Sequence, residues 1–84
     1  MSSEQLTAET IEKLQELEND INIPKNIKIK VKSIINILKG DIELSIKINK
    51  ALNELDEISN DANLEPYTRT QIWNIVSILE KTNH

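Results

Sequence analysis

Several kinds of residue are scarce or missing in this 84-residue sequence. It has no cysteine, which excludes disulfides and thiolate metal sites. It has no Phe, and Tyr67 and Trp73 are its only aromatic residues, so aliphatic residues must form the core. Gly40 is the single glycine, and Pro24 and Pro66 are the only prolines. So few turn-forming residues favour a helical protein with few connections.

Long apolar runs are missing as well. No run approaches the ~20 residues that a membrane-spanning helix needs, and no charged and then apolar leader opens the chain. We therefore expect a cytoplasmic protein without a membrane segment. Its 38% hydrophobic and 29% charged residues indicate a folded chain, and its length indicates one small domain, residues 1–84.

The net charge of −4 hides a separation of charge along the chain. Residues 1–20 contain six acidic residues and one basic residue, Lys13. Residues 21–40 contain no acidic residue and five lysines: Lys25, Lys28, Lys30, Lys32 and Lys39.

An internal repeat organises the sequence. The segment from Leu17, "LENDINIPKNIKIKVKSIINILK", aligns at an offset of 41 residues with the segment from Ile58, "ISNDANLEPYTRTQIWNIVSILE". Both contain the connector pattern N-D-x-N-[IL], and each repeat has the pattern of a helix, a short connector and a second helix. The expected helices are about 7–18, 24–39, 42–59 and 66–81.

Five residues mark the expected helix ends. Thr7, or a serine before it, is the expected N-cap of the first helix. Pro24 and Pro66 suit the first turns of the second and fourth helices. Gly40 is the expected left-handed residue after the second helix, and Asp41 the expected cap of the third.

The stretch "IKIKVK" (Ile27–Lys32) alternates like a half-buried strand. On a helix, however, five apolar residues from Ile27 to Leu38 form one stripe, and only Ile29 falls well outside it. No second alternating segment could pair with a strand here, and the repeat counterpart "TRTQIW" does not alternate. We therefore predict a helix.

Two helical hairpins with short connectors predict an antiparallel up-and-down four-helix bundle. An open pair of HEAT-like repeats is the second choice, because stacked repeats need about three units to bury their faces.

The segments "LDEISND" (Leu55–Asp61) and "TRTQIWNIVSILE" (from Thr68), together with the connector pattern, resemble the archaeal uncharacterised protein family 0147. The resemblance covers nearly the whole chain. It implies a small all-helical protein in an archaeal cytoplasm, and it implies no reaction.

The residues needed for catalysis are largely absent. His84 is the only histidine, and there is no Gly-rich phosphate loop. Glu12 and Glu16 are one helical turn apart but lack the Glu-x-x-His pattern of metal sites in bundles. The acidic residues near Asp61 lack the spacing of a Ca²⁺ loop. We expect no enzyme activity, no cofactor and no metal site.

Apolar residues outside the helix stripes indicate a contact surface. Ile42 and Ile46 point away from the buried face of the third helix, and Ile37 is expected near them across the Gly40 turn. An exposed aliphatic patch of this kind is typical of association with a protein partner or a second copy.

Arg69 and Trp73 share a face of the fourth helix, with Tyr67 in the same first turns. They have two interpretations. They form a docking surface, since Trp, Tyr and Arg dominate binding hot spots. Alternatively, Trp73 fills the bundle and Arg69 pairs with an acid such as Asp61, which is the interpretation we favour from sequence.

A lysine stripe runs along the second helix and comprises Lys25, Lys28, Lys32 and Lys39. It could contact the phosphates of a nucleic acid. The stripe lacks arginine and a stacking aromatic, and the pI of about 4.9 is far below the ~9 typical of such binders. The simpler interpretation pairs it with Glu9, Glu12 and Glu16 of the first helix. The sequence thus predicts a non-enzymatic interaction module, with weak sequence-nonspecific nucleic-acid binding as the alternative.

Overall fold

The structure is a computed structural model that describes residues 2–82, apart from the side chain of Ser3. Its helices are α1 (Ser3–Glu18), α2 (Lys25–Lys39), α3 (Leu44–Ser59) and α4 (Pro66–Thr82), and the described residues form no strand. The stretch Ile27–Lys32 lies within α2, so its helical interpretation is confirmed.

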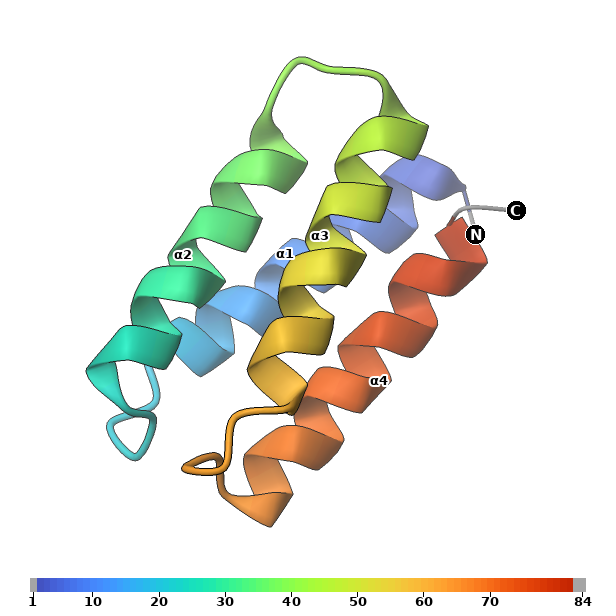
Figure 1. The fold of residues 1–84 in the computed structure, drawn as a ribbon. Helices are drawn as coiled ribbons and strands as arrows, with labels where there is room; N and C mark the ends of the chain where they lie inside the picture. Colours follow the sequence, from blue (N-terminus) through green and yellow to red (C-terminus); the bar gives the residue numbers. More distant parts are fainter. Residues whose placement is uncertain (1, 83–84) are drawn as a thin grey trace.

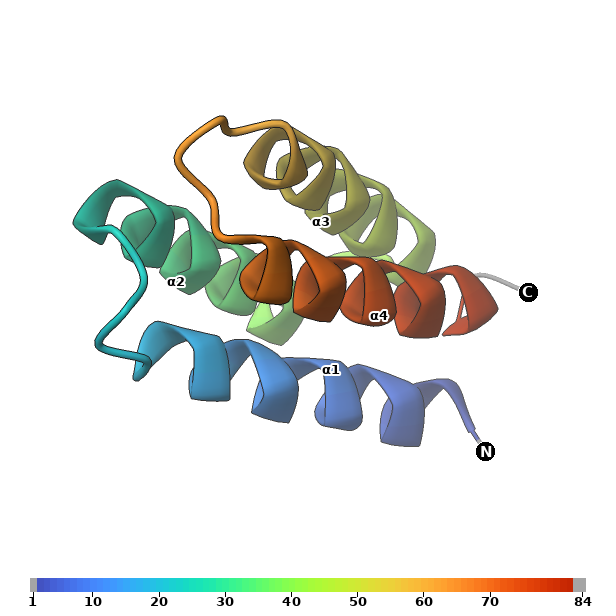
Figure 2. The ribbon, with the colours of Figure 1, turned by 90° about the horizontal axis from the view of Figure 1, so that it is seen from below.

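The helices form a closed, antiparallel four-helix bundle (Figures 1 and 2). α1 packs against α2 and α4, and α3 packs against the same two helices. Across the diagonals, α1 with α3 and α2 with α4, no Cα atoms of these four helices approach within 8 Å. The ring of neighbours confirms the bundle and excludes the open HEAT-like pair. The connectors 19–24 and 60–65 lie at one end, and the connector 40–43 lies at the other (Figure 1).

Burial follows the 41-residue repeat. Leu14 and its counterpart Leu55 are both completely buried. The same holds for Val31 and Ile72. Two buried threonines donate their hydroxyls to carbonyls of their own helices: Thr10 Oγ1 to Leu6 over 2.8 Å, and Thr82 Oγ1 to Ile78 over 3.1 Å. The two hairpins therefore contribute equivalent faces to one core that contains no aromatic side chain.

α1 starts earlier than expected. Its N-cap is Ser2, the serine alternative to Thr7, and the helix begins at Ser3, four residues before the expected start. The Gln5 amide N–H donates to Ser2 Oγ (3.2 Å), and the Ser2 amide N–H donates to Gln5 Oε1 (3.0 Å). This reciprocal capping box satisfies two N–H groups that a helix start leaves without partners, which explains the extra turn.

The connector between α2 and α3 corrects two predictions. Gly40 has φ −66° and ψ 164°, so it is extended rather than left-handed. Its lack of a side chain matters because a Cβ would lie 3.2 Å from the Ile37 carbonyl oxygen. Asp41 does not cap α3: the N-cap is Glu43, whose side chain makes no capping hydrogen bond.

The prolines also differ from each other. Pro66 is the first residue of α4, as expected. Pro24 precedes α2 as its N-cap, with ψ 147°, and its carbonyl accepts hydrogen bonds from the amides of Ile27 and Lys28. The expected place of Pro24 inside the first turn is therefore wrong by one residue.

Candidate functional site

The two N-D-x-N-[IL] connectors form the same turn. Asp20 Oδ1 accepts a hydrogen bond from the Asn22 amide over 2.8 Å, and Asp61 Oδ1 accepts one from the Asn63 amide over 2.8 Å. An aspartate that accepts from the backbone two residues later stabilises a tight turn. This pattern accounts for the repeated connector residues without a ligand.

Arg69 fixes the second connector. Its Nε donates to the Ser59 carbonyl and its terminal NH2 group to the Asp61 carbonyl, both over 3.0 Å. The expected partner Asp61 is right, but the acceptor is its backbone oxygen and not its carboxylate. Arg69 thus places a positive charge at the C-terminal end of α3, where the helix dipole and unpaired carbonyls favour it.

Trp73 does not fill the bundle. It is 56% exposed, because it lies outside the buried stripe of α4 that contains Ile72 and Ile75. The interpretation that we favoured from sequence is therefore wrong for this residue. Arg69 and Trp73 are one turn apart on the same flank of α4, which is the flank from which Arg69 reaches α3.

Tyr67 is 68% exposed and belongs to another flank of α4. Its hydroxyl accepts a hydrogen bond from Gln71 Nε2 over 3.1 Å, and Gln71 lines a hollow against α1. Since six residues correspond to about one and two-thirds helical turns, Tyr67 and Trp73 do not form one patch.

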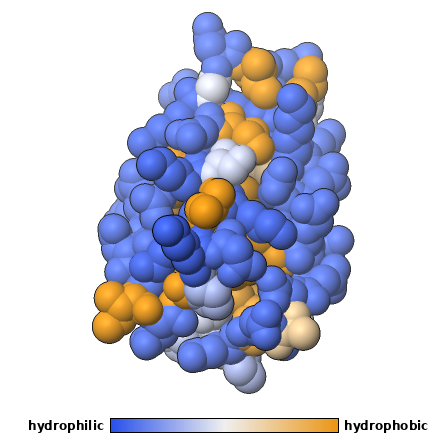
Figure 3. Space-filling view, turned by 60° about the vertical axis from the view of Figure 1, so that its left-hand side comes forward, coloured by the Kyte–Doolittle hydropathy of each residue, from blue (hydrophilic) through white to orange (hydrophobic). Residues whose placement is uncertain are grey.

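The aliphatic candidates are scattered. Ile42 and Ile46 are 45% and 46% exposed, whereas Ile37 is half-buried. Ile29 (62%) and Ile21 (90%) are more exposed than either, and neither was a sequence candidate. Ile21 occupies the x position of N-D-x-N-[IL]. The second connector has the small residue Ala62 at this position, and this difference in size is the sequence signal that could have identified Ile21 as an exposed residue. On the face that carries α2, Figure 3 shows separate apolar areas surrounded by hydrophilic surface.

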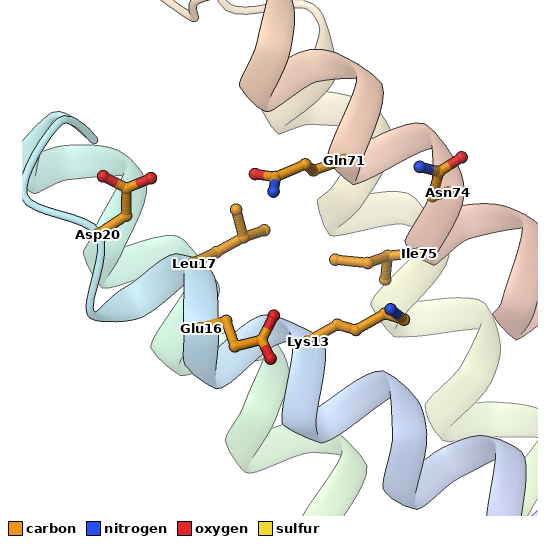
Figure 4. A pocket seen from close by; sticks show the side chains of 7 residues that line it. All are labelled: Lys13, Glu16, Leu17, Asp20, Gln71, Asn74 and Ile75. Carbon is orange, nitrogen blue, oxygen red and sulfur yellow. The ribbon is translucent and has the colours of Figure 1, made fainter.

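A hollow of about 150 Å³ lies between α1 and α4 (Figure 4). Sequence reasoning did not identify it, because it needs α1 beside α4. Gln71 Oε1 is buried there without a hydrogen-bond partner. Polar side chains surround the apolar pair Leu17 and Ile75, and the lining residues are Lys13, Glu16, Leu17, Asp20, Gln71, Asn74 and Ile75.

A second, more apolar hollow of about 240 Å³ lies between α1 and the first turn of α3. Ile11 and Leu44, which are only partly buried, contribute to its wall. Ala8 and Lys47 also line it.

The lysine stripe is largely exposed. Lys25, Lys32 and Lys39 are exposed, and Lys28 is half-buried. The glutamates do not lie opposite these lysines. Glu9, Glu12 and Glu16 share one stripe of α1, and Glu16 lines the hollow against α4, not α2. Among residues 2–82, no lysine or arginine lies within 4.0 Å of a carboxylate oxygen, so the charges expected to match do not form close ion pairs.

The model of an uncharacterised protein family, UPF0147, matches residues 1–82. The chain belongs to this family. The UPF0147 protein MJ1419 of Methanocaldococcus jannaschii is 45% identical over 69 residues, which are 81% of this chain and 74% of that protein. The UPF0147 protein of Methanosarcina mazei is 35% identical over 79 residues, 93% of this chain and 85% of that one. The crystal structure of MMP1188, a protein of unknown function, superposes with a TM-score of 0.85 at 37% identity, covering 89% of this chain and 86% of that one.

These UPF0147 relatives come from archaea, as the resemblance implied, and their names assign no activity. Within residues 2–82 no group of His, Cys, Asp or Glu side chains is arranged to hold a metal ion. His84 lies outside the described residues. No described helix is long and apolar enough to cross a membrane.

Proposed function

We propose that this UPF0147 protein is a non-enzymatic interaction module of the archaeal cytoplasm, an adaptor or subunit that binds a protein partner. Its docking surface is the flank of α4 that carries Arg69 and Trp73. The observation that supports this most is the placement of the aromatic residues: the core is aliphatic, and both aromatic side chains of the chain are exposed on α4.

An exposed tryptophan contributes less to the stability of the fold than a buried one. Burying a large apolar side chain contributes ~1.5–3 kcal/mol, and much of this contribution is made only when a partner covers Trp73. Tryptophan and arginine are also the residue types most enriched among those that dominate interface energy.

The surroundings of Trp73 are pre-ordered. The two hydrogen bonds of Arg69 hold the first turns of α4 against the end of α3. Trp73 follows one turn later, on a helix rather than on a loop. A rigid surface loses less conformational freedom when it binds, which supports a role in docking.

The test compares Trp73→Ala with Tyr67→Ala, which removes the other exposed aromatic residue of α4 from a different flank. Tagged proteins are purified from the native cytoplasm with nuclease treatment. We expect a defined protein to co-purify with the parent and with Tyr67→Ala. The recovered amount of this protein should fall about tenfold or more with Trp73→Ala, because the change removes a residue that dominates the binding energy. Equal recovery with both variants would refute the surface.

Trp73 also reports on binding directly, because it is the only tryptophan. When the co-purified partner is added to the parent, the fluorescence of the exposed indole should shift to shorter wavelength as it loses contact with water. An unchanged spectrum on binding would place the interface elsewhere.

The alternative function, weak sequence-nonspecific nucleic-acid binding, rests on the lysine stripe. The observation that favours it is that these lysines have no carboxylate partner among the described residues. The acidic pI of about 4.9 argues against it.

A further inference from the structure

The hollow between α1 and α4 contains a buried acceptor that lacks a donor. Gln71 Nε2 donates to the Tyr67 hydroxyl over 3.1 Å, which fixes the orientation of the amide. The other amide atom, Oε1, is buried in the hollow, and no group of residues 2–82 donates to it. Figure 4 shows the Gln71 side chain reaching over Leu17, with its oxygen on the side where Asp20 lies. A buried carbonyl oxygen without a donor is unfavourable, so this position favours a ligand that brings an N–H or O–H group.

The charge of the hollow favours a cation. Its lining contains two carboxylates, from Glu16 and Asp20, and one ammonium group, from Lys13. The Glu16 carboxylate is turned towards the Lys13 side chain (Figure 4), so the charge of Lys13 is offset within the hollow. Asp20 lies at the connector end, and its Oδ1 accepts a hydrogen bond from the Asn22 amide over 2.8 Å. This hydrogen bond holds the carboxylate in place and uses only one of its two oxygens.

The floor of the hollow is apolar, and the space is small. Leu17 and Ile75 are buried side chains that form the apolar part of the lining. The volume of the hollow is about 150 Å³, and a cavity of about this volume can bind benzene. A cation on a chain of about four carbons therefore fits the space. Its chain would lie on the apolar floor, and its charged head would lie near Asp20 and Gln71.

The internal repeat provides a comparison for this site. At the offset of 41 residues, the helix pair α1–α4 corresponds to the pair α3–α2, which is also in contact. Asp20 corresponds to Asp61, and the two aspartates make the same turn hydrogen bond. Gln71 corresponds to Lys30, which is half-buried.

The residue at the equivalent place carries the chemical group that the hollow would accept. A lysine side chain is a four-carbon chain that ends in an ammonium group. The pair α2–α3 therefore has an alkylammonium group of its own, from Lys30, where the pair α1–α4 has the shorter Gln71 beside a hollow. Glu54 corresponds to Lys13, so the corner that has its own lysine is also the more acidic one.

We propose that the hollow between α1 and α4 binds a primary alkylammonium group. The N–H groups of this ligand donate to Gln71 Oε1 and to the Asp20 carboxylate, and its carbon chain lies on the apolar floor. A free small amine and the lysine side chain of a protein both carry the group. The site lies on the flank of α4 that faces α1, whereas the proposed function rests on the Arg69–Trp73 flank, so either can fail without the other.

The first probe is n-butylammonium, added to isotope-labelled protein and followed by NMR. We expect saturable shifts of the side-chain amides of Gln71 and Asn74, which line the hollow. The dissociation constant should be on the order of 1 mM, as expected for so small a ligand. Butyrate, which has the opposite charge, and tetramethylammonium, which has no N–H group, should not cause these shifts. Equal shifts with either control, or no saturable shift with n-butylammonium, refute the proposal.

A change of charge at Asp20 tests the first polar contact. Asp20→Asn keeps the acceptor for the turn but removes the charge, and it should weaken binding of n-butylammonium about tenfold or more. Asp61→Asn makes the same change in the other connector, so it is the matched control and should bind like the parent. Equal binding by the two variants would contradict the role of Asp20.

Two changes at Gln71 test the second contact. Gln71→Leu removes the buried acceptor and should weaken binding without loss of stability, because that oxygen has no donor among residues 2–82. Gln71→Lys brings an ammonium group into the hollow, as Lys30 does at the equivalent position, and should abolish binding. Circular dichroism checks that both variants remain folded. Binding at the affinity of the parent by either folded variant refutes the site.

A second probe distinguishes the two sources of the ammonium group. Nα-acetyl-lysine amide presents a lysine side chain as a protein does. If it binds more tightly than n-butylammonium, the site takes a lysine of a protein; if it binds more weakly, the site takes a free amine. Both results support the site, and failure of both probes overturns it. Trp73→Ala should bind the probes like the parent, so loss of partner capture is distinguishable from loss of amine binding.

Discussion

The two hairpins, α1–α2 and α3–α4, share their interiors and differ on their surfaces. Their buried positions and their connector hydrogen bonds correspond at an offset of 41 residues. At the same offset Lys28 corresponds to Arg69, and Lys32 corresponds to Trp73. The lysine stripe and the Arg69–Trp73 flank are thus equivalent places on two similar frames. The comparison indicates that the repeat specifies the fold, whereas the surface residues at equivalent positions differ between the hairpins.

The connectors differ in how firmly they are held. Arg69 binds two carbonyls at the end of α3, and its planar guanidinium suits two acceptors at once. Lys28, at the equivalent position, is half-buried and carries a single ammonium group. The second connector is consequently fixed from both of its helices.

The largest expected effect tests the equivalence of the interiors. Leu14→Ala and Leu55→Ala each remove a completely buried side chain, and each should lower the free energy of unfolding by ~2–5 kcal/mol. The two values should agree within about 1 kcal/mol if the hairpins pack alike. Urea denaturation monitored by circular dichroism measures both. A large loss in one variant and a small loss in the other would show that the core is not evenly shared.

The next effect sharpens the difference between the connectors. Arg69→Ala should lower stability by ~1–3 kcal/mol, because two carbonyls lose a charged donor. Lys28→Ala, the matched change, should cost less than about 0.5 kcal/mol. Arg69→Lys should recover only part of the loss, since one ammonium cannot reproduce the two-pronged contact. Equal losses for Arg69→Ala and Lys28→Ala would remove the distinction.

The periodicity of the sequence was sufficient to predict the four helices and their closed bundle, because each repeat places one apolar stripe on each of its helices. It failed at Gly40, which is not left-handed, and at Asp41, which does not cap α3. It also failed at Trp73, which is adjacent in sequence to the buried Ile72. Whether such a boundary residue turns inward depends on the space between helices, which the periodicity of the sequence does not specify.

The charged stripes show a second limit of sequence reasoning. Periodicity placed Glu9, Glu12 and Glu16 on one stripe correctly, but it could not say which neighbour that stripe faces. Only the closed ring, with α1 between α2 and α4, turns Glu16 towards α4. The hollow that Glu16 lines was unpredictable for the same reason.

A smaller effect tests the correspondence of the two turns. Asp20→Ala and Asp61→Ala each remove an acceptor for a backbone amide, and each should cost ~0.5–1.5 kcal/mol. Asp20→Asn and Asp61→Asn keep an acceptor oxygen and should cost clearly less. The second connector should tolerate its Ala change better, because Arg69 holds it from α4 as well. Thermal unfolding of the four variants provides the ranking, and a reversed order would contradict the role of Arg69.

The smallest expected effect concerns the lysine stripe. Lys28→Gln with Lys32→Gln should change stability by no more than about 0.5 kcal/mol, because surface substitutions without close partners rarely do more. We expect no measurable RNA binding by the parent at physiological salt. Phosphate contact predicts instead that the parent binds, that binding weakens steeply with salt, and that the salt slope falls by about one unit for each lysine removed. Titration of parent and variant with single- and double-stranded RNA at two salt concentrations distinguishes these cases. If the parent binds RNA clearly and the variant does not, the function rests on the surface of α2 and not on that of α4.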